Sequence, residues 1–420
     1  MRGIAQAGKS LLLPHEQMYP KIELKSERRK QFQGHKHPWI FSGAIRQLEK
    51  IPADWNGQIV SVYIEGQFLL HGYFNRQSQI AVRALSWREN EVIDQNFLEK
   101  KIEQALLLRK QLILSPQTTA CRLIFAESDF LPGFIVDQYN NTLILQIHTL
   151  GAEKLKPLFL NALVNGYKNI LGESPVAVRE ISDLPARALE GLPKTHYEHL
   201  WGEQTDRETI LENGFRFLVD FEHGQKTGFF LDQRENRLAI TKYCQGKNIL
   251  NLFSYSGAFS VYAAENQAKS VDSVDISAEA IRMASANLDL NQVSCAHREI
   301  SADCFQFLEN IQPGQYELVI VDPPAFIKSR KDFNEGLKGY ISINALALKA
   351  LPENGILVSS SCSAALNDDD FLRLLNWAAE SANCQLQIME KKAQPADHPL
   401  TPYFPEGNYL KFMIMRKVAI

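Results

Sequence analysis

The regular alternation of apolar runs and amphipathic segments in the second half of the chain constrains the fold more than any other feature. Strand-like runs at 248–253, 270–275, 318–322 and 355–359 are separated by segments with helical periodicity. Such alternation predicts a doubly wound, mostly parallel sheet, and sheets of this kind bind ligands beyond the carboxyl ends of their strands. We therefore expect an α/β domain over residues 192–420. Helices are expected over 257–266, 278–288, 301–309, 336–350 and 369–379, and further strands over 384–390 and 409–415.

Two smaller domains are expected before it. Short strand-like runs broken by turn residues over 19–93 predict a small β-barrel. A helix, three strand-like runs and a second helix over 94–191 predict a small α+β domain. Residues 1–18 lack both a signal-peptide core and a cleavage site, and we expect a disordered leader. A length of 420 residues is consistent with about three domains.

The charge balance excludes a chain that wraps nucleic acid by bulk charge, because 45 basic residues face 48 acidic ones. Residues 19–93 are an exception, with 11 basic and 7 acidic residues. Their cations Lys25, Arg28, Arg29 and Lys36 precede Trp39 and form a candidate phosphate-contacting patch. A solvated face with a core tryptophan is the alternative, and the sequence leaves both open.

Cysteine usage and hydropathy indicate the cellular compartment in which the protein is expected. The six cysteines form no CxxC pair, which is typical of reduced thiols in the cytoplasm. No apolar run reaches the roughly 18 residues that a membrane span needs. We expect no metal site and no membrane contact, and a homodimer is possible.

A nucleoside-binding pattern follows the first two strands of the α/β domain. Gly257 stands alone after the first strand, where we expect it to let a cofactor approach the backbone. Asp275 ends the second strand, which suits hydrogen bonding to ribose hydroxyls. The GxGxxG pattern of pyrophosphate sites is absent. The pattern therefore favours S-adenosylmethionine over a dinucleotide.

Two adjacent strand ends carry groups that could act on a base. Asp322 precedes Pro323 and Pro324, which fix a rigid loop and remove two backbone donors. Cys362 follows the next strand in a serine-rich setting. A lone cysteine in a sheet is usually inert packing. Beside the Asp-Pro-Pro loop, however, a nucleophilic thiol that adds to an electron-poor ring becomes the favoured interpretation.

Five motifs in order carry a family resemblance. They are Gly224–Asn236, Asn251–Gly257, Val274–Ser277, Asp322–Phe326 and Ser361–Ser363. This set resembles the large-subunit (23S) ribosomal RNA cytosine-C5 methyltransferases that carry an N-terminal PUA domain. The resemblance covers nearly all of the chain after residue 19. It implies a class I, Rossmann-like methyltransferase domain, S-adenosylmethionine as cofactor and ribosomal RNA as partner.

The resemblance also implies roles for individual residues. Those implied to close over the cofactor are Gln225, Lys226, Phe229, Asp232 and Arg234. Those implied to hold its methionine part are Asn251, Phe253, Ser254, Tyr255 and Gly257, while Asp275 and Ile276 would take the ribose side and Asp303 the adenine edge. On the substrate side the implied residues are Asp322, Pro323, Pro324, Phe326 and Lys328, with Cys362 as nucleophile at C6 of cytosine. Because no second cysteine accompanies the prolines, a one-cysteine mechanism is implied, in which water or a carboxylate removes the C5 proton.

Three rival functions stay open. Asp-Pro-Pro loops also serve methyltransferases that act on adenine N6 or guanine N2 and need no cysteine. A non-catalytic RNA-binding assembly factor could retain the cofactor site. An NAD-dependent enzyme is disfavoured by the missing glycines.

Overall fold

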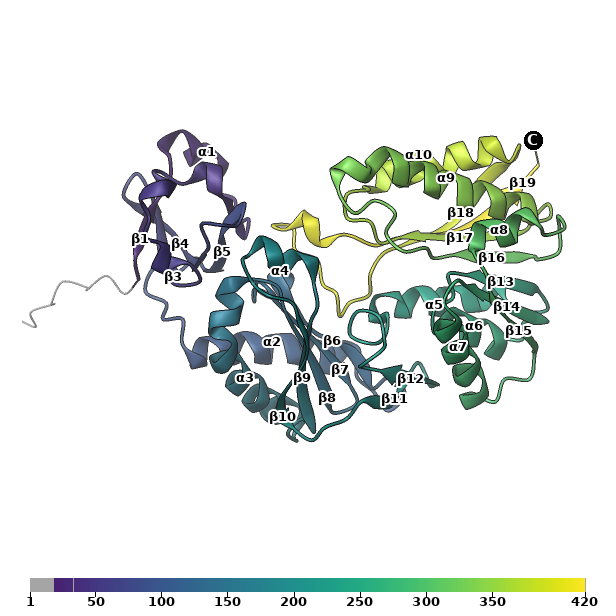
Figure 1. Cartoon of the computed structure of the whole chain (residues 1–420), viewed down its shortest axis with the longest axis horizontal. Coiled ribbons are helices and arrows are strands. Elements are labelled where there is room, and N and C mark those ends of the chain that lie inside the picture. The colour runs from purple at the N-terminus through teal and green to yellow at the C-terminus, as the bar shows by residue number, and fades with distance from the viewer. Residues whose placement is uncertain (1–18, 33, 420) are drawn as a thin grey trace, which may run out of the picture.

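The computed structural model describes residues 19–32 and 34–419, so the expected leader lies outside the described residues. The chain forms three parts that follow one another in sequence (Figure 1). The first is a five-stranded sheet in the order β1-β3-β4-β5-β2. Its elements are β1 (Lys21–Glu23), α1 (Arg29–Phe32), β2 (Trp39–Phe41), β3 (Ile59–Ile64), β4 (Gln67–Phe74) and β5 (Ile80–Ser86).

The middle part is a five-stranded sheet in the order β10-β9-β8-β7-β6, packed against two long helices. Its elements are α2 (Gln95–Leu112), β6 (Ala120–Phe125), β7 (Phe134–Tyr139), β8 (Thr142–Ile147), α3 (Leu150–Leu171), β9 (Ala177–Ser182), α4 (Pro185–Leu189) and β10 (Thr195–Gly202). Asp94 caps α2 by accepting from the Phe97 N–H, and Thr149 caps α3 in the same way. The sheet extends past the boundary expected at residue 191, because β10 pairs with β9.

A two-stranded hairpin that the sequence analysis did not include follows the middle sheet. It consists of β11 (Arg207–Glu212) and β12 (Phe215–Asp220). Asn213 and Gly214 form its turn with φ of 51° and 87°. Positive φ at both turn residues is what an Asn-Gly hairpin turn requires, so the local signal was present in the sequence.

The last part is a seven-stranded sheet in the order β15-β14-β13-β16-β17-β19-β18. Its strands are β13 (Asn248–Leu252), β14 (Ser270–Asp275), β15 (Ala296–Ser301), β16 (Leu318–Val321), β17 (Ile356–Ser361), β18 (Gln385–Lys392) and β19 (Lys411–Val418). The five strands β13 to β17 are parallel, and β19 runs antiparallel to both of its neighbours. The expected doubly wound, mostly parallel sheet is confirmed.

Helices cover both faces of this sheet. One hydrophobic core contains side chains of α5 (Arg234–Ile240), α6 (Ala258–Glu265) and α7 (Ala278–Leu290). The opposite core contains side chains of α8 (Cys304–Glu309), α9 (Phe333–Ala350) and α10 (Asp368–Ser381). Neighbouring residues of one strand serve opposite cores, as Ile249 and Leu250 do, because side chains alternate along a strand. The order of the strands reverses at β13, which places the switch point between β13 and β16.

In the last part, one strand and two helix starts differ from expectation. The helix expected from Gly336, α9, begins at Phe333. The edge strand β15 was missed because its sequence, Ala-His-Arg-Glu-Ile-Ser, is mostly polar and has no fully buried position. The helix expected to begin near Ser301 begins at Cys304. Asp303 caps it by accepting from the N–H groups of Phe305 and Gln306.

The segment between β18 and β19 connects all three parts. It extends from the last sheet toward the first one (Figure 1), where Phe404 lies edge-on to Trp39 at 4.8 Å between ring centroids. Nearer the middle sheet, buried Asp397 accepts from Arg234 at 2.8 Å and 3.0 Å. The same carboxylate accepts from the backbone N–H of Arg122 in β6 at 3.0 Å. A carboxylate on one connecting segment thus joins the middle sheet to α5.

We expect Asp397→Asn to lower the free energy of unfolding by about 3 kcal/mol, because the buried Arg234 guanidinium would lose its charged partner. Glu335→Gln is the matched control, since its carboxylate is 80% exposed and pairs with Lys338 at the surface. That change should stay within about 0.5 kcal/mol of wild type. Chemical denaturation measures both variants, and equal losses would contradict the structural role of Asp397.

Candidate active site

A cavity of about 440 Å³ lies at the carboxyl ends of the central strands. The loop before α5, the loop after β13, the end of β14 and the Asp322 loop after β16 form its walls, together with Cys362 after β17. The predicted residues that line it are Gln225, Lys226, Phe229, Asp232, Phe253, Ser254, Tyr255, Asp275, Ile276, Asp322, Pro323, Pro324 and Cys362. The cavity therefore gathers residues from segments up to 185 positions apart, from Gln225 to Leu410, at the edge of the sheet where the sequence pattern placed a site.

The loop after β13 adopts an unusual backbone conformation. Phe253, Tyr255 and Gly257 have φ of 55°, 45° and 72°. Left-handed conformations at non-glycine residues carry strain and are often found at functional sites. The Tyr255 N–H donates to Asp275 at 3.0 Å, and its hydroxyl accepts from the Gln225 N–H at 2.8 Å. Tyr255 thereby connects two walls of the cavity.

Gly257 itself does not line the cavity, although its neighbours Ser256 and Ala258 do, so its expected contact with the cofactor remains a prediction. A Cβ at this position would lie 2.7 Å from the Cβ of Ala284 in α7. The glycine is needed for its positive φ and for the close packing of this loop against α7.

Asp275 is held as an acceptor at the cavity edge. Its two oxygens accept from the N–H groups of Tyr255 and Ser277, at 3.0 Å and 2.9 Å. Each carboxylate oxygen retains acceptor capacity toward the cavity. The adjacent Ile276 is 73% exposed although it is apolar, so it offers a flat face next to the acceptor. This pairing fits a ribose with its base, and no phosphate-binding glycine cradle accompanies it.

Asp232 is a buried carboxylate with charged and neutral donors. It accepts from the Lys226 ammonium at 3.0 Å and from the Tyr409 hydroxyl at 2.7 Å, both at Oδ2. Burial alone would raise the pKa of Asp232, but the Lys226 charge and these hydrogen bonds hold it well below its usual range. Its buried Oδ1 has no hydrogen-bond partner among the described residues. An ionised, half-satisfied carboxylate in this wall fits the cationic methionine part of S-adenosylmethionine.

Asp322 has a raised pKa, in contrast to the lowered pKa of Asp232. It accepts from Gln233 Nε2 at 2.9 Å and from the Ser360 hydroxyl. Burial raises the pKa of Asp322 to about 6, because the Ser360 hydrogen bond only partly offsets the loss of solvation. Burial likewise raises the pKa of the Cys362 thiol above its ordinary value, while the Lys226 charge opposes the rise. The site thus combines a carboxyl group that can carry a proton near neutral pH with a thiol that needs assistance to ionise.

Several predicted residues lie outside the cavity wall. Arg234 is buried and pairs with Asp397 instead of facing the cavity. Asn251 is buried beneath the loop and donates to Ser260 at 2.8 Å, and Asp303 caps α8. Phe326 packs on Tyr340 at 4.8 Å, and Lys328 is exposed. Direct contacts of these residues with cofactor or substrate remain predictions.

Other lining residues were missed by the sequence analysis. Phe230, Gln233, Arg237, Ser256, Ala258, Phe259, Ala325 and Leu410 also border the cavity. Gln233 lies inside the first family motif, which was a usable signal. Tyr409, which bonds Asp232, lies about 180 residues away in sequence, and only the packing of the segment before β19 brings it there.

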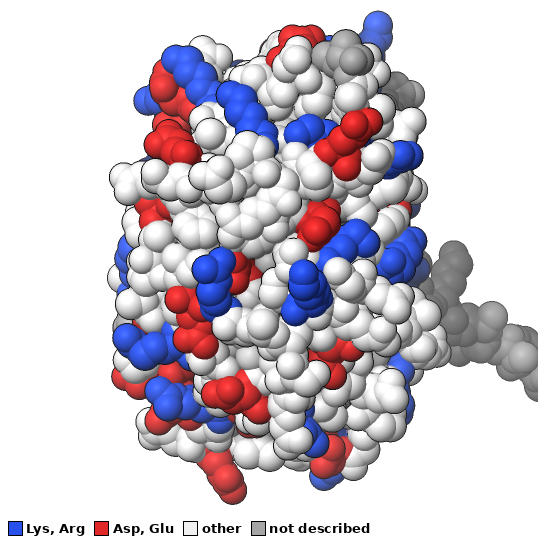
Figure 2. All heavy atoms as spheres, turned by 90° about the vertical axis from the view of Figure 1, so that its right-hand side faces the viewer, with Lys and Arg blue, Asp and Glu red and all other residues white. Residues whose placement is uncertain are grey.

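The candidate patch on the first sheet is only partly available. Lys25, Arg28 and Lys36 form no ion pair within the described part of the chain, whereas Arg29 pairs with Glu65. On the last part of the molecule, acidic and basic side chains intermingle over the face drawn in Figure 2. Contacts between basic side chains and RNA phosphates would therefore depend on small local groups of basic residues, as the near balance of positive and negative charge indicated.

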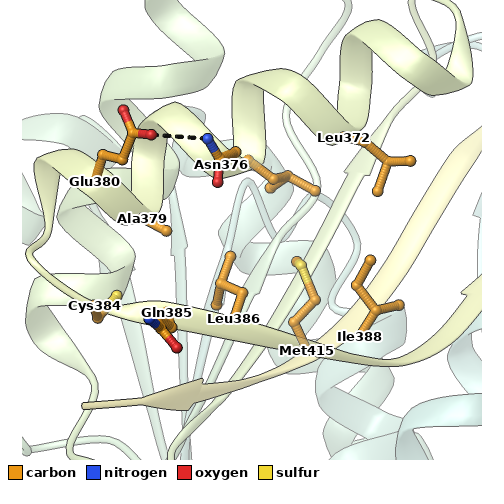
Figure 3. A pocket seen from close by; sticks show the side chains of 10 residues that line it. Leu372, Asn376, Ala379, Glu380, Cys384, Gln385, Leu386, Ile388 and Met415 are labelled. Atoms are coloured by element: carbon orange, nitrogen blue, oxygen red, sulfur yellow. Dashed lines mark hydrogen bonds between the residues drawn. The ribbon is translucent and has the colours of Figure 1, made fainter. Parts of the chain in front are cut away.

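A second cavity, of about 520 Å³, lies between α10 and β18 (Figure 3). Its lining is mainly aliphatic, and its one acidic side chain, Glu380, accepts from Asn376 at 2.9 Å. Within the described ranges, no group of three His, Cys, Asp or Glu side chains is arranged to hold a metal ion. Among the helices of the described residues, none is long and apolar enough to cross a membrane. The cavity at the switch point is the one with convergent chemistry.

The fold and this cavity define an S-adenosylmethionine-dependent methyltransferase. Residues 187–407 match the family described as "S-adenosylmethionine-dependent methyltransferase", and residues 22–87 match a PUA-like domain. Similar proteins include ribosomal RNA large subunit methyltransferase I of Pseudoalteromonas translucida, 37% identical over 91% of this chain and 95% of that protein. The same enzyme of Yersinia pseudotuberculosis is 37% identical over 90% and 94%. The chain belongs to the family of ribosomal RNA large subunit methyltransferase I.

Solved structures agree on the fold. A structure from Streptococcus mutans, described as a SAM-dependent methyltransferase, has a TM-score of 0.79 at 23% identity and covers 94% of this chain and 100% of its own. A methyltransferase structure complexed with SAH has a TM-score of 0.80 with the same identity and coverage. These structures confirm the expected fold class. The family match confirms the expected cofactor, S-adenosylmethionine.

We expect Asp275→Ala to weaken S-adenosylmethionine binding by about 1.5–3 kcal/mol, the range for lost hydrogen bonds to a charged group. Asp289→Ala is the control, because Asp289 is an exposed carboxylate on α7, outside the cavity wall. Calorimetry measures both affinities, and NAD should bind neither protein. Unchanged affinity in Asp275→Ala would contradict the assignment of β14 as the ribose-binding strand.

Proposed function

We propose that this protein transfers a methyl group from S-adenosylmethionine to C5 of a cytosine in large-subunit ribosomal RNA, with Cys362 as a covalent nucleophile. The observation that carries the proposal is the meeting of Cys362 and Asp322 in one cavity, at the ends of the neighbouring strands β17 and β16. The names of the relatives support ribosomal RNA as the substrate. The motif resemblance supports cytosine C5 as the acceptor.

The proposed chemistry follows from the weak nucleophilicity of cytosine C5. The Cys362 thiol first loses its proton to solvent; its Sγ then bonds to C6, and the electrons of the C5–C6 double bond move to C5. Asp322, in its protonated form, donates a hydrogen bond to N3 and stabilises the charge that develops in the ring. S-adenosylmethionine would supply an electrophilic methyl group to C5 and leave as the neutral thioether S-adenosylhomocysteine. Loss of the C5 proton to water or a carboxylate, and cleavage of the S–C6 bond, then restore the ring and free Cys362.

The protonation states of the two side chains are consistent with these roles. A pKa of about 6 leaves a usable fraction of Asp322 protonated near neutral pH, as a donor to N3 requires.

The target base must leave its stack to reach the cavity, so single-stranded or loop RNA is the expected substrate form. The raised pKa of the Cys362 thiol favours a second candidate, methylation of an exocyclic amino group at the Asp322 loop without a covalent step.

We expect Cys362→Ala to abolish methyl transfer and leave S-adenosylmethionine affinity unchanged, because the thiol forms the bond to C6. RNA with 5-fluorocytosine at the target should trap a covalent adduct on wild type, since fluorine cannot leave as a proton does. Cys304→Ala is the matched control. Cys304 is buried beneath the same loops, accepts from the Phe253 N–H and does not line the cavity. Methyl transfer is measured with labelled cofactor, and the adduct by mass spectrometry.

The control variant should keep both activity and trapping. A fully active Cys362→Ala enzyme would rule out the addition mechanism and support the amino-group alternative. Cofactor binding without any methyl transfer by wild type would instead support a non-catalytic RNA-binding factor.

We further propose that the first sheet contacts RNA phosphates through Lys25, Arg28 and Lys36. Changing all three to Gln should reduce the slope of log affinity against log salt by about 2–3, since each lost phosphate contact removes about 0.7–0.9. Lys100, Lys168 and Lys349, all exposed elsewhere, changed to Gln give a control of equal charge. Filter binding across a salt series measures both variants. An unchanged slope in the first variant would show that these three side chains are only solvent-exposed and do not contact RNA phosphates.

A further inference from the structure

A buried lysine that does not line the cavity contacts the turn that carries Cys362. Lys411 begins β19, is 2% exposed and lies opposite Ser361 in the antiparallel pairing with β17. Its ammonium donates to the carbonyl oxygens of Ser363 and Tyr409, at 2.7 Å each. Lys411 thus joins the residue after the thiol to the residue whose hydroxyl bonds Asp232.

The charge of Lys411 is unusual for its burial. In the described part of the chain its ammonium bonds the two carbonyl oxygens, while the nearby Asp368 pairs with Lys391 at 3.5 Å, although burial of a charge is costly without a charged partner. Asp368 at the start of α10 and the Cys362 sulfur are the groups whose charges act on it, and Asp369 and Glu406 border the same surface hollow. Burial lowers the pKa of Lys411 to about 8, while Cys362 and Asp368 favour its charged form.

We propose that Lys411 is a positioning residue for Cys362, whose two carbonyl contacts hold the thiol beside Asp322 and whose buried charge increases the fraction of Cys362 present as thiolate. The proton that leaves Sγ passes to solvent through the cavity. The inference deepens the proposed function, because thiolate supply at Cys362 is what the addition to C6 needs.

Other charged groups also face the thiol and define what Lys411 adds. Lys226 favours the thiolate, whereas Asp322 and Asp232 disfavour it. The hydroxyls of Tyr340 and Tyr409 also interact electrostatically with Cys362. Because all of these stay in place when Lys411 alone is changed, the effect of that change reports the lysine itself.

The test is the pH dependence of Cys362 alkylation in the full-length protein without RNA. Iodoacetamide forms a bond to the thiolate sulfur with loss of iodide, and peptide mass mapping reads Cys362 separately from the other cysteines. Lys411→Gln keeps a hydrogen-bond donor and removes the charge, whereas Lys411→Arg keeps the charge. We expect alkylation at pH 7.5, where Lys411 is still mostly charged, to be about tenfold slower in Lys411→Gln, and the difference to fade above about pH 9, where the wild-type lysine is neutral as well. Lys411→Arg should stay close to wild type at pH 7.5.

Lys417 provides a matched control on the same strand. Its ammonium also donates to two carbonyl oxygens, those of Leu348 and Leu351, and the cysteine that acts on it is Cys384 beside the second cavity (Figure 3). Lys417→Gln should leave the Cys362 profile unchanged.

An unchanged alkylation rate at pH 7.5 in a folded Lys411→Gln protein, with normal S-adenosylmethionine affinity, would overturn the proposal. If Lys411→Gln does not fold, Lys411→Arg decides: slower alkylation at pH 7.5 despite the retained charge would overturn the proposal, and a wild-type rate at that pH would support it. The proposed function fails separately, if wild type shows the expected alkylation profile but methylates no ribosomal RNA.

Discussion

The ion pair between Asp397 and Arg234 is the interaction on which the arrangement of the site depends. Arg234 starts α5, directly after the loop that supplies Lys226 and Asp232 to the cavity, and Asp397 lies on the segment that later supplies Tyr409. The same carboxylate holds the backbone of β6 through the Arg122 N–H. Because this pair is fully buried, neither partner can be solvated alone, so the two segments must dock together.

The docking creates two carboxylates with opposite properties in one cavity. Asp232, beside the Lys226 ammonium and the Tyr409 hydroxyl, stays ionised. Asp322, partly buried in the cavity wall and without a cation in hydrogen-bond contact among the described residues, has a pKa of about 6. Different environments for paired acids are a general way to separate a charge-stabilising group from a proton-carrying one. The proposed cofactor side of the cavity thus has an ionised carboxylate, whereas the proposed base-binding side has a carboxyl group that can carry a proton.

The segment between β18 and β19 also relates the first sheet to the catalytic cavity. Phe404 packs on Trp39, and His37 lies 3.2 Å from Glu406. The same segment continues to Tyr409 and Lys411, which contact Asp232 and the Cys362 turn. RNA bound to the first sheet would therefore lie near one end of this segment, and a base in the cavity would lie near its other end.

The sequence by itself determined the α/β class, the edge of the sheet at which the site lies, and the strand-end residues Asp275, Asp322 and Cys362, because periodicity and strand order fix which residues converge. It did not show the polar edge strand β15, whose residues lack a buried face, or the addition of β10 to the middle sheet. Only the tertiary structure decided that Arg234 is a structural partner of Asp397 and that Gly257 packs on Ala284. It alone also shows that the Tyr409 hydroxyl bonds Asp232 and that the Lys411 ammonium bonds the Ser363 carbonyl. Those outcomes depend on contacts between segments distant in sequence, which no local pattern encodes.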